Sequence, residues 1–447
     1  MKYQLVSDVH GRFKEVKWDE DADIVLAAGD ISENIEEGHK FLRTSPVPVL
    51  FLPGNHEYYK GDMLERHQRM KDLCDESNGH ITFMDKEVVH LDDTRIIAST
   101  LWTSFNNFDP LLIDCAYSVM NDYRHISIPS LNQKESWRAQ IDLLKDAYLE
   151  ARKKLYGKGG IERRLLEENF SSRQKVKISN YNIDLNILDN YNSENFSPFV
   201  AYLLNKASKH WLEKSLSEPF EGKTLVMTHH APSRLALSLG DYKINPREVD
   251  FGTYLKKKTA NHKIGAYTNS LEGLAMNHNI DGWVHGHFHE YMNYRLGSAN
   301  VICNPTGTKS SATSGFETYI FNLDDNEKRI GLRNLLKHAI DLLNKLNSWF
   351  ENESRNETTF DKLNFASVLS SIWEEVEVLI ISLKSLPAEE IPDFVHLDIS
   401  NPLKSEEVFK DYQRLLTYDD VRIGIKVMHH RIKDLQPQLQ KWITYTL

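Results

Sequence analysis

The sequence predicts an α/β fold, a sandwich of sheets and helices, followed by an all-α C-terminal domain. Three observations predict this architecture: short apolar runs of β type, helix-like segments between them, and a change to long helical periodicity near residue 333. The runs are almost continuously apolar rather than alternating, which favours strands covered on both faces. In chain order they span residues 3–7, 23–28, 48–53, 95–100, 224–228 and 281–286.

The first domain is expected to span residues 1–325, with helix-like segments such as 62–76 between the strands and an insertion at about 133–195. Residues 151–177 carry nine Lys or Arg and three Glu, a net charge of +6 in a chain of −10. An Asn-rich stretch follows at 180–195. We therefore expect the insertion to be helical first and a loop afterwards.

Residues 333–447 are expected to form the α-helical C-terminal domain, which has a typical domain size. Apolar residues recur at helical spacing over 335–350 and again over 368–383, with a polar connection at 351–359. These helices would cap a site, form an oligomer or bind a protein partner. The sequence favours none of the three.

The bulk composition fits a folded protein of two to three domains, because the chain has 447 residues. Hydrophobic residues make up 40% and charged residues 26%, which allows a packed core and argues against global disorder. The net charge of −10 argues against a general polyanion binder, although a local basic surface remains compatible with it.

The cysteines and the N-terminus predict a cytoplasmic protein with no membrane association. The three cysteines are widely spaced and form no CxxC, so a disulfide framework is not expected. The apolar run in MKYQLVSDVH is too short for a signal peptide, and no stretch approaches 18 consecutive apolar residues.

Polar side chains follow five of the predicted strands, where each strand ends. Because ligands of open α/β sheets gather at the carboxyl ends of strands, we expect these side chains to form one site. Glycines at 29, 54 and 286 fit a backbone that turns sharply or lets a group come close. The side chains are Asp8, His10, Asp30, Asn55, His56, His229, His230, His287 and His289.

These residue types indicate a metal site. Carboxylates, imidazoles and an amide oxygen are ligands for Mn²⁺, Fe or Zn²⁺. The set contains no cysteine, which disfavours a structural zinc site. Seven candidate ligands suffice for two ions: Asp8, His10, Asp30, Asn55, His229, His287 and His289.

The ordered motifs D-x-H, GD, GNH[ED], an H followed by HxP, and GHxH resemble those of the calcineurin-like metallophosphoesterases over about residues 1–325. The segments TLWT, NDYRHI, THHAPS, WVHGHFH and CNPTG look like one bacterial-type branch of small phosphoesterases. GDISEN departs from the GDxVDRG of protein Ser/Thr phosphatases, which disfavours that subclass. The resemblance implies a four-layer α/β/β/α metallophosphoesterase sandwich.

The resemblance also implies roles for individual residues. Asp30 would bridge two divalent ions, with Mn²⁺ as first choice and Fe or Zn²⁺ as alternatives. His56 would contact the phosphate or protonate the leaving group, whereas His230 would line the site or support a ligand. The first ion would be held by Asp8, His10 and His289, and the second by Asn55, His229 and His287.

The expected function is hydrolysis of a phosphomonoester or phosphodiester by attack of a metal-bridging hydroxide on phosphorus. One alternative is a nuclease that uses the basic insertion to guide nucleic acid, although the segment lacks the aromatic–basic alternation of single-strand binders. A second alternative is a metal-binding scaffold that recruits partners through the helical domain. Arg124 would bind phosphate or pair with an acid, and Trp102 is expected in the core.

Overall fold

The computed structural model describes residues 1–108, 112–113, 116–117, 120–156, 195–236, 267–306, 318–323 and 334. The predicted C-terminal domain, residues 333–447, lies outside the described residues apart from Asn334. The same holds for residues 157–194 of the predicted insertion, including most of its basic segment.

The first sheet has five strands in the order β13-β1-β2-β3-β5. Four of them run parallel, and β13 pairs antiparallel with β1 at one edge. The three predicted strands of this half are confirmed at β1, β2 and β3. The strands span Tyr3–Val6 (β1), Ile24–Ala27 (β2), Val49–Phe51 (β3), Ile81–Phe83 (β5) and Tyr319–Phe321 (β13).

The second sheet has six strands in the order β11-β12-β10-β9-β7-β6. The four central strands are parallel, and an antiparallel strand flanks them at each edge. The other three predicted strands are confirmed at β7, β9 and β10. The strands span Glu87–Leu91 (β6), Thr94–Ser99 (β7), Lys223–Thr228 (β9), Gly282–His285 (β10), Met292–Leu296 (β11) and Ala299–Cys303 (β12).

The two sheets pack face to face over an apolar core. Successive side chains of a strand point to opposite faces, so each buried strand contributes to two layers. Leu26 of β2 lies in the core shared with Met227 of β9, whereas its neighbours Val25 and Ala27 face the helices on the other side. This double burial explains why the runs are apolar throughout.

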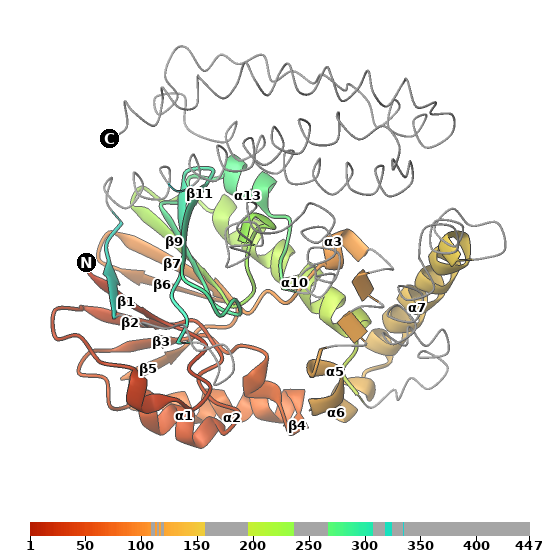
Figure 1. The fold of residues 1–447 in the computed structure, drawn as a ribbon, viewed down its shortest axis with the longest axis horizontal. Helices are drawn as coiled ribbons and strands as arrows, with labels where there is room; N and C mark the ends of the chain where they lie inside the picture. The colour runs from red at the N-terminus through yellow and green to blue at the C-terminus, as the bar shows by residue number, and fades with distance from the viewer. Residues whose placement is uncertain are drawn as a thin grey trace, which may run out of the picture.

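Helices cover the outer face of each sheet (Figure 1), which gives the order helix, sheet, sheet, helix. On the first sheet, α1 and α2 pack against the side chains of β2 and β3. On the second, α10 contacts β7 and α13 contacts β11. The helices span Ile35–Leu42 (α1), Met63–Asp75 (α2), Pro198–Ser217 (α10) and Glu272–Asn277 (α13).

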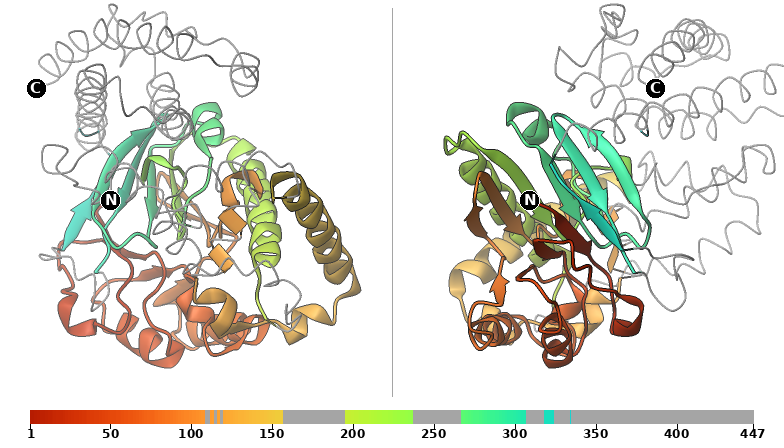
Figure 2. Two further views of the ribbon diagram at one scale, coloured as in Figure 1. Left: turned by 45° about the vertical axis from the view of Figure 1, so that its right-hand side comes forward. Right: turned by 90° about the vertical axis from the view of Figure 1, so that its left-hand side faces the viewer.

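Local signals set the helix starts. The Asp62 carboxylate accepts from the first turn of α2, and the Ser197 hydroxyl accepts from Val200 N–H at the start of α10. α7 (Glu135–Tyr156) confirms that the insertion begins as a helix, and it lies beside α10 (Figure 2). Short elements complete the described chain: η1 (Phe13–Glu15), η2 (His56–Tyr58), α3 (Phe105–Phe108), α5 (Asp122–His125) and α6 (Pro129–Asn132).

A two-stranded parallel ribbon ties the segment NDYRHI to the loop after β3. Its strands are β4 (Gly61–Asp62) and β8 (Ile126–Ser127). The Lys60 N–H also donates to the His125 carbonyl at 2.7 Å. These bonds place α5 directly beside the GNHEYY turn. Among the described residues, no helix is long and apolar enough to cross a membrane.

Candidate metal centre

The candidate side chains all follow parallel strands at the same edge of their sheets. The loops after β1, β2 and β3 come from the first sheet, and those after β9 and β10 from the second. The carboxyl ends of parallel strands share an edge, so sheet-on-sheet packing brings five loops together. The resulting three-residue clusters with ligand atoms within 4.8 Å of one another are Asp8, His10 and His289; His10, Asp30 and His56; and Asp30, His229 and His287.

The backbone of this site is held in an unusual conformation. Asp8, His10, Asp30 and His287 have φ values of 51°, 49°, 56° and 66°. Such values lie in the left-handed region, which non-glycine residues rarely adopt and which concentrates at functional sites. The loops stabilise one another, since Asp8 N–H donates to Gly29 O at 3.0 Å and His10 N–H to Asp30 O at 2.9 Å.

Two of the predicted glycines permit close approach of these loops. Gly29 has φ +91°, and a Cβ there would collide with the His229 ring. A Cβ at Gly54 would collide with both the Asp30 carboxylate and His229. Any side chain at these positions would therefore displace candidate ligands.

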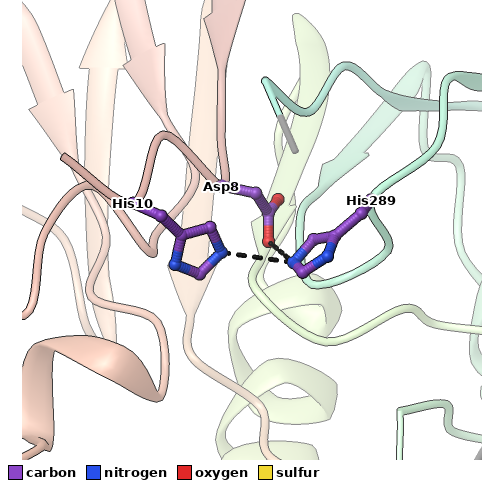
Figure 3. A group of neighbouring side chains, drawn as sticks. All are labelled: Asp8, His10 and His289. Carbon is purple, nitrogen blue, oxygen red and sulfur yellow. Dashed lines mark hydrogen bonds and ion pairs between the residues drawn. The ribbon is translucent and has the colours of Figure 1, made fainter. Parts of the chain in front are cut away.

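Asp8, His10 and His289 form what we call the outer group (Figure 3). His10 and His289 point toward each other, with their Nε2 atoms 3.2 Å apart, and His289 Nε2 lies 3.6 Å from Asp8 Oδ1. The His287 backbone N–H lies 3.0 Å from both Asp8 oxygens. The His10 and His289 side chains are 12% and 29% exposed, so this group faces the surface.

Asn55, His229 and His287 form the inner group. His229 Nε2 lies 3.1 Å from Asn55 Oδ1 and 3.2 Å from His287 Nδ1. His229 Nδ1 lies 2.8 Å from the Ala28 carbonyl, an acceptor only, so Nδ1 carries the hydrogen and Nε2 faces the site. All three side chains are buried.

Asp30 stands between the two groups. Its Oδ2 lies 3.8 Å from His10 Nε2 in the outer group, and its Oδ1 lies 3.4 Å from His229 Nε2 in the inner group. The carboxylate is 1% exposed and also accepts from the His56 backbone N–H at 2.9 Å. One carboxylate therefore reaches both clusters of imidazoles.

Burial keeps three of the imidazoles neutral. It lowers the pKa of His10 and of His289 to about 4, and it lowers the pKa of His287 well below its usual range. A neutral imidazole has a free lone pair, which is the state that binds metal. Burial also raises the pKa of Asp8 to about 7.

Asp30 and His229 behave as a charged pair. Burial disfavours charge on both, but the Asp30 carboxylate, together with Asp8 and the Ala28 carbonyl, outweighs it and raises the pKa of His229 to about 9. Conversely, despite burial, the neighbouring His229 and His56 hold the pKa of Asp30 well below its usual range. A proton on His229 thus balances the Asp30 charge.

The donor set fits divalent metal ions. Carboxylate, imidazole and amide oxygen ligands converge from five loops, and two ring nitrogens lie 3.2 Å apart in each group. Comparison with known proteins agrees with this chemistry: the family model described as calcineurin-like phosphoesterase matches residues 1–291, more than half of the chain. The chain belongs to the calcineurin-like phosphoesterase family. The resemblance inferred from the motifs is thereby confirmed.

Relatives of this family member include the uncharacterized protein L509 of Acanthamoeba polyphaga mimivirus, 23% identical over 302 residues, which cover 66% of this chain and 81% of that protein. A solved phosphopantetheinyl hydrolase from Mycobacterium tuberculosis is 14% identical with a TM-score of 0.37, covering 69% of this chain and 90% of that chain. A second solved structure is 10% identical with a TM-score of 0.34, and the match covers 72% of this chain and 99% of that chain.

The candidate metal centre includes a buried carboxylate, Glu57, to which the motifs assign no role. Glu57 is 1% exposed and accepts from the backbone N–H groups of Asp30, Ile31, Ser32 and Gly54 at 2.6–3.0 Å. It therefore fixes the loop that carries Asp30 against the loop that carries Asn55. The signal was present as the fourth residue of GNHE.

His56 and His230 differ in position although both neighbour candidate ligands. His56 Nε2 lies 3.9 Å from Asp30 Oδ2, and its side chain is 24% exposed at the mouth of the site. His230 is buried, with its ring 4.3 Å from that of His287 and Nδ1 3.3 Å from the Thr100 carbonyl. Burial lowers the pKa of His230 to about 3, so it packs as a neutral ring.

Trp102 is part of the core, as predicted. It is 4% exposed, and its ring centroid lies 4.6 Å from that of Phe196 and 5.5 Å from that of His230. Arg124 lies on α5, where Nη1 donates to the Met120 carbonyl at 3.3 Å.

Proposed function

We propose that this protein is a dinuclear-metal phosphoesterase that hydrolyses a phosphomonoester or a phosphodiester. The observation that carries the proposal is the position of Asp30, one buried carboxylate within 3.8 Å of an imidazole in each of two ligand groups. A shared carboxylate is what two adjacent ions require. Family membership supports the same class of reaction.

In this proposal the outer group (Asp8, His10, His289) holds one ion, the inner group (Asn55, His229, His287) holds the other, and Asp30 is common to both. When bound, such ions polarise phosphoryl oxygens and lower the pKa of water. Mn²⁺ is our first choice, with Fe or Zn²⁺ as alternatives, because the ligand types suit all three.

His56 is the proposed general acid. Its ring lies between two carboxylates, with Nε2 3.9 Å from Asp30 Oδ2 and Nδ1 3.6 Å from Glu33 Oε1. The partly exposed ring can reach a substrate that enters at the mouth. His56 would donate a proton to the leaving oxygen, or a hydrogen bond to the phosphate.

The choice between the functional alternatives depends on two segments of the chain, the basic insertion and the C-terminal helices. The nuclease alternative depends on the basic segment, and the scaffold alternative depends on the C-terminal helices; both lie almost entirely outside the described residues. The scaffold alternative is disfavoured by the complete set of candidate ligands together with His56. We therefore retain a phosphate ester as the substrate class and separate monoester from diester by experiment.

The test compares hydrolysis of bis-p-nitrophenyl phosphate and p-nitrophenyl phosphate by full-length protein stripped of metal and then given Mn²⁺. We expect Mn²⁺-dependent turnover that falls by about 10³-fold or more in Asp30→Asn, because a loss of several kcal/mol of charge stabilisation corresponds to that factor. The ratio of the two rates assigns the ester class. Bound Mn²⁺ without turnover of either ester would support the scaffold alternative instead.

A further inference from the structure

We propose that Tyr59 and Asp122 form a positioning pair that sets the orientation of two proposed functional side chains at once, the Asn55 amide and the His56 ring. The inference rests on the proposed function and extends it to residues outside both ligand groups. Its basis is one continuous set of contacts among four side chains, three of them buried.

The first contact fixes the Asn55 amide. Asn55 Nδ2 donates to Asp122 Oδ1 at 2.7 Å, while Asn55 Oδ1 lies 3.1 Å from His229 Nε2. An ionised carboxylate only accepts hydrogen bonds, so the amide nitrogen must be the end that faces Asp122. The amide oxygen is thereby directed toward the inner group. Without Asp122, the amide could turn its NH₂ toward the ion.

The second contact extends from the same carboxylate to His56. Tyr59 OH donates to Asp122 Oδ1 at 2.6 Å, and the Tyr59 ring stacks on the His56 ring with centroids 4.2 Å apart and planes at 26°. Tyr59 is 4% exposed, so it cannot shift without opening the core. The hydroxyl bond fixes Tyr59, and the Tyr59 face limits the rotation of His56.

The backbone explains how Asp122, 67 residues away from Asn55 in the chain, is placed so closely. Asp122 begins α5, and the strand β8 that follows pairs with β4 just after the GNHEYY turn. The Lys60 N–H also donates to the His125 carbonyl. The carboxylate is therefore attached to the same rigid ribbon as the residues that it orients.

A purely structural role would also explain a buried carboxylate with two donors, so the test must separate the two. It measures the affinity and stoichiometry of Mn²⁺ by calorimetry and metal analysis on full-length wild type, Asp122→Ala, Asn55→Ala and the double variant. Outer-shell partners of metal ligands typically contribute about 10–100-fold in affinity. We expect Asp122→Ala to lower the affinity for one of the two Mn²⁺ ions by about that factor.

The double variant decides the mechanism. If Asp122 acts through Asn55, the double variant binds Mn²⁺ no more weakly than Asn55→Ala alone. Additive losses, or unchanged affinity in Asp122→Ala, would overturn the inference. Asp62→Ala is the matched control. Asp62 lies in β4 of the same ribbon, and its buried carboxylate accepts from three backbone N–H groups in α2 and α6, none of them from a proposed ligand. The substitution should lower the melting temperature and leave both affinities unchanged.

Two Tyr59 variants test the proposed effect of Tyr59 on the orientation of His56. They remain informative if Asp122→Ala fails to fold. Tyr59→Phe keeps the ring against His56, whereas Tyr59→Leu removes it. We expect kcat about tenfold lower in Tyr59→Leu than in Tyr59→Phe, with equal Mn²⁺ affinity. Equal kcat values in the two variants would refute the claim that the Tyr59 ring orients His56. Wild-type protein that binds none of Mn²⁺, Fe²⁺ and Zn²⁺ would overturn the proposed function itself, whereas normal wild-type binding with unaffected variants would overturn only this inference.

Discussion

The inner and outer ligand groups each have two imidazoles and share Asp30, but the third ligand is the Asn55 amide in the inner group and the Asp8 carboxylate in the outer, and their surroundings differ. In the inner group His229 is fully buried, its Nδ1 is held by the Ala28 carbonyl, and Asn55 is held by Asp122. In the outer group the His289 side chain is 29% exposed and meets Asp8 and His10 directly. An ion in the inner group would thus be held by pre-oriented ligands, and an ion in the outer group would be nearer to solvent and substrate.

The surroundings of the ligands, and not their identity alone, therefore set the properties of each metal position. Burial lowers the pKa of the imidazoles in both groups, but only at His229 do the Asp30 carboxylate and its other neighbours outweigh burial, so the two groups differ in protonation state. The inner group carries a proton on His229 in the metal-free protein, whereas the outer imidazoles are already neutral. We expect the two positions to differ in affinity, exchange rate and pH response.

The largest expected effect comes from removing one ligand of each group. His229→Ala and His289→Ala should each reduce bound Mn²⁺ from two ions to one and lower turnover by about 10³-fold. Metal analysis after gel filtration measures the stoichiometry. The ion left in His229→Ala, held by the outer group, should be removed by a chelator faster than the ion left in His289→Ala. Equal release rates would contradict the proposed difference between the groups.

A smaller effect is expected at the mouth, beside the outer group. The His56 ring centroid lies 4.5 Å from that of His10, and the side chain is proposed as an acid rather than a ligand. His56→Ala should keep both ions and lose about 10²–10³-fold in turnover. Parallel metal analysis and steady-state kinetics measure the two properties. Loss of an ion from this variant would make His56 a ligand instead.

The smallest effect is a different pH response of the two positions. The pKa of His229 is about 9, so an ion entering the inner group releases its proton, and affinity should rise about tenfold per pH unit up to about pH 9. The outer imidazoles are neutral above about pH 4, and Asp8, with a pKa of about 7, loses its proton near neutrality. Affinity there should stop rising near pH 7.

Calorimetry of metal-free protein with Mn²⁺, repeated in buffers of different ionisation enthalpy, measures the protons released at each position. At pH 8 we expect about one proton from the inner position and a small fraction from the outer. His289→Ala and His229→Ala assign the two binding events. Identical proton release at both positions would contradict the proposed difference in protonation between the inner and outer groups.

Six of the strands, the start of the insertion as a helix, and the residues that gather at the site could be predicted from the sequence. It could do so because strands buried on both faces must be apolar throughout, and because the carboxyl ends of parallel strands share one edge. Local chemistry was enough to predict that Asp8, Asp30 and His229 would meet.

The resemblance already implied how these residues divide into two groups, whereas the folded structure was needed to show what supports each group. His10 and His289 are 279 residues apart and meet because the two sheets pack face to face. The roles of Glu57 and Asp122 depend on backbone N–H groups and an amide supplied by distant loops. A sequence motif shows which groups can accept hydrogen bonds, but their partners, burial and pKa values are fixed only when the chain is folded.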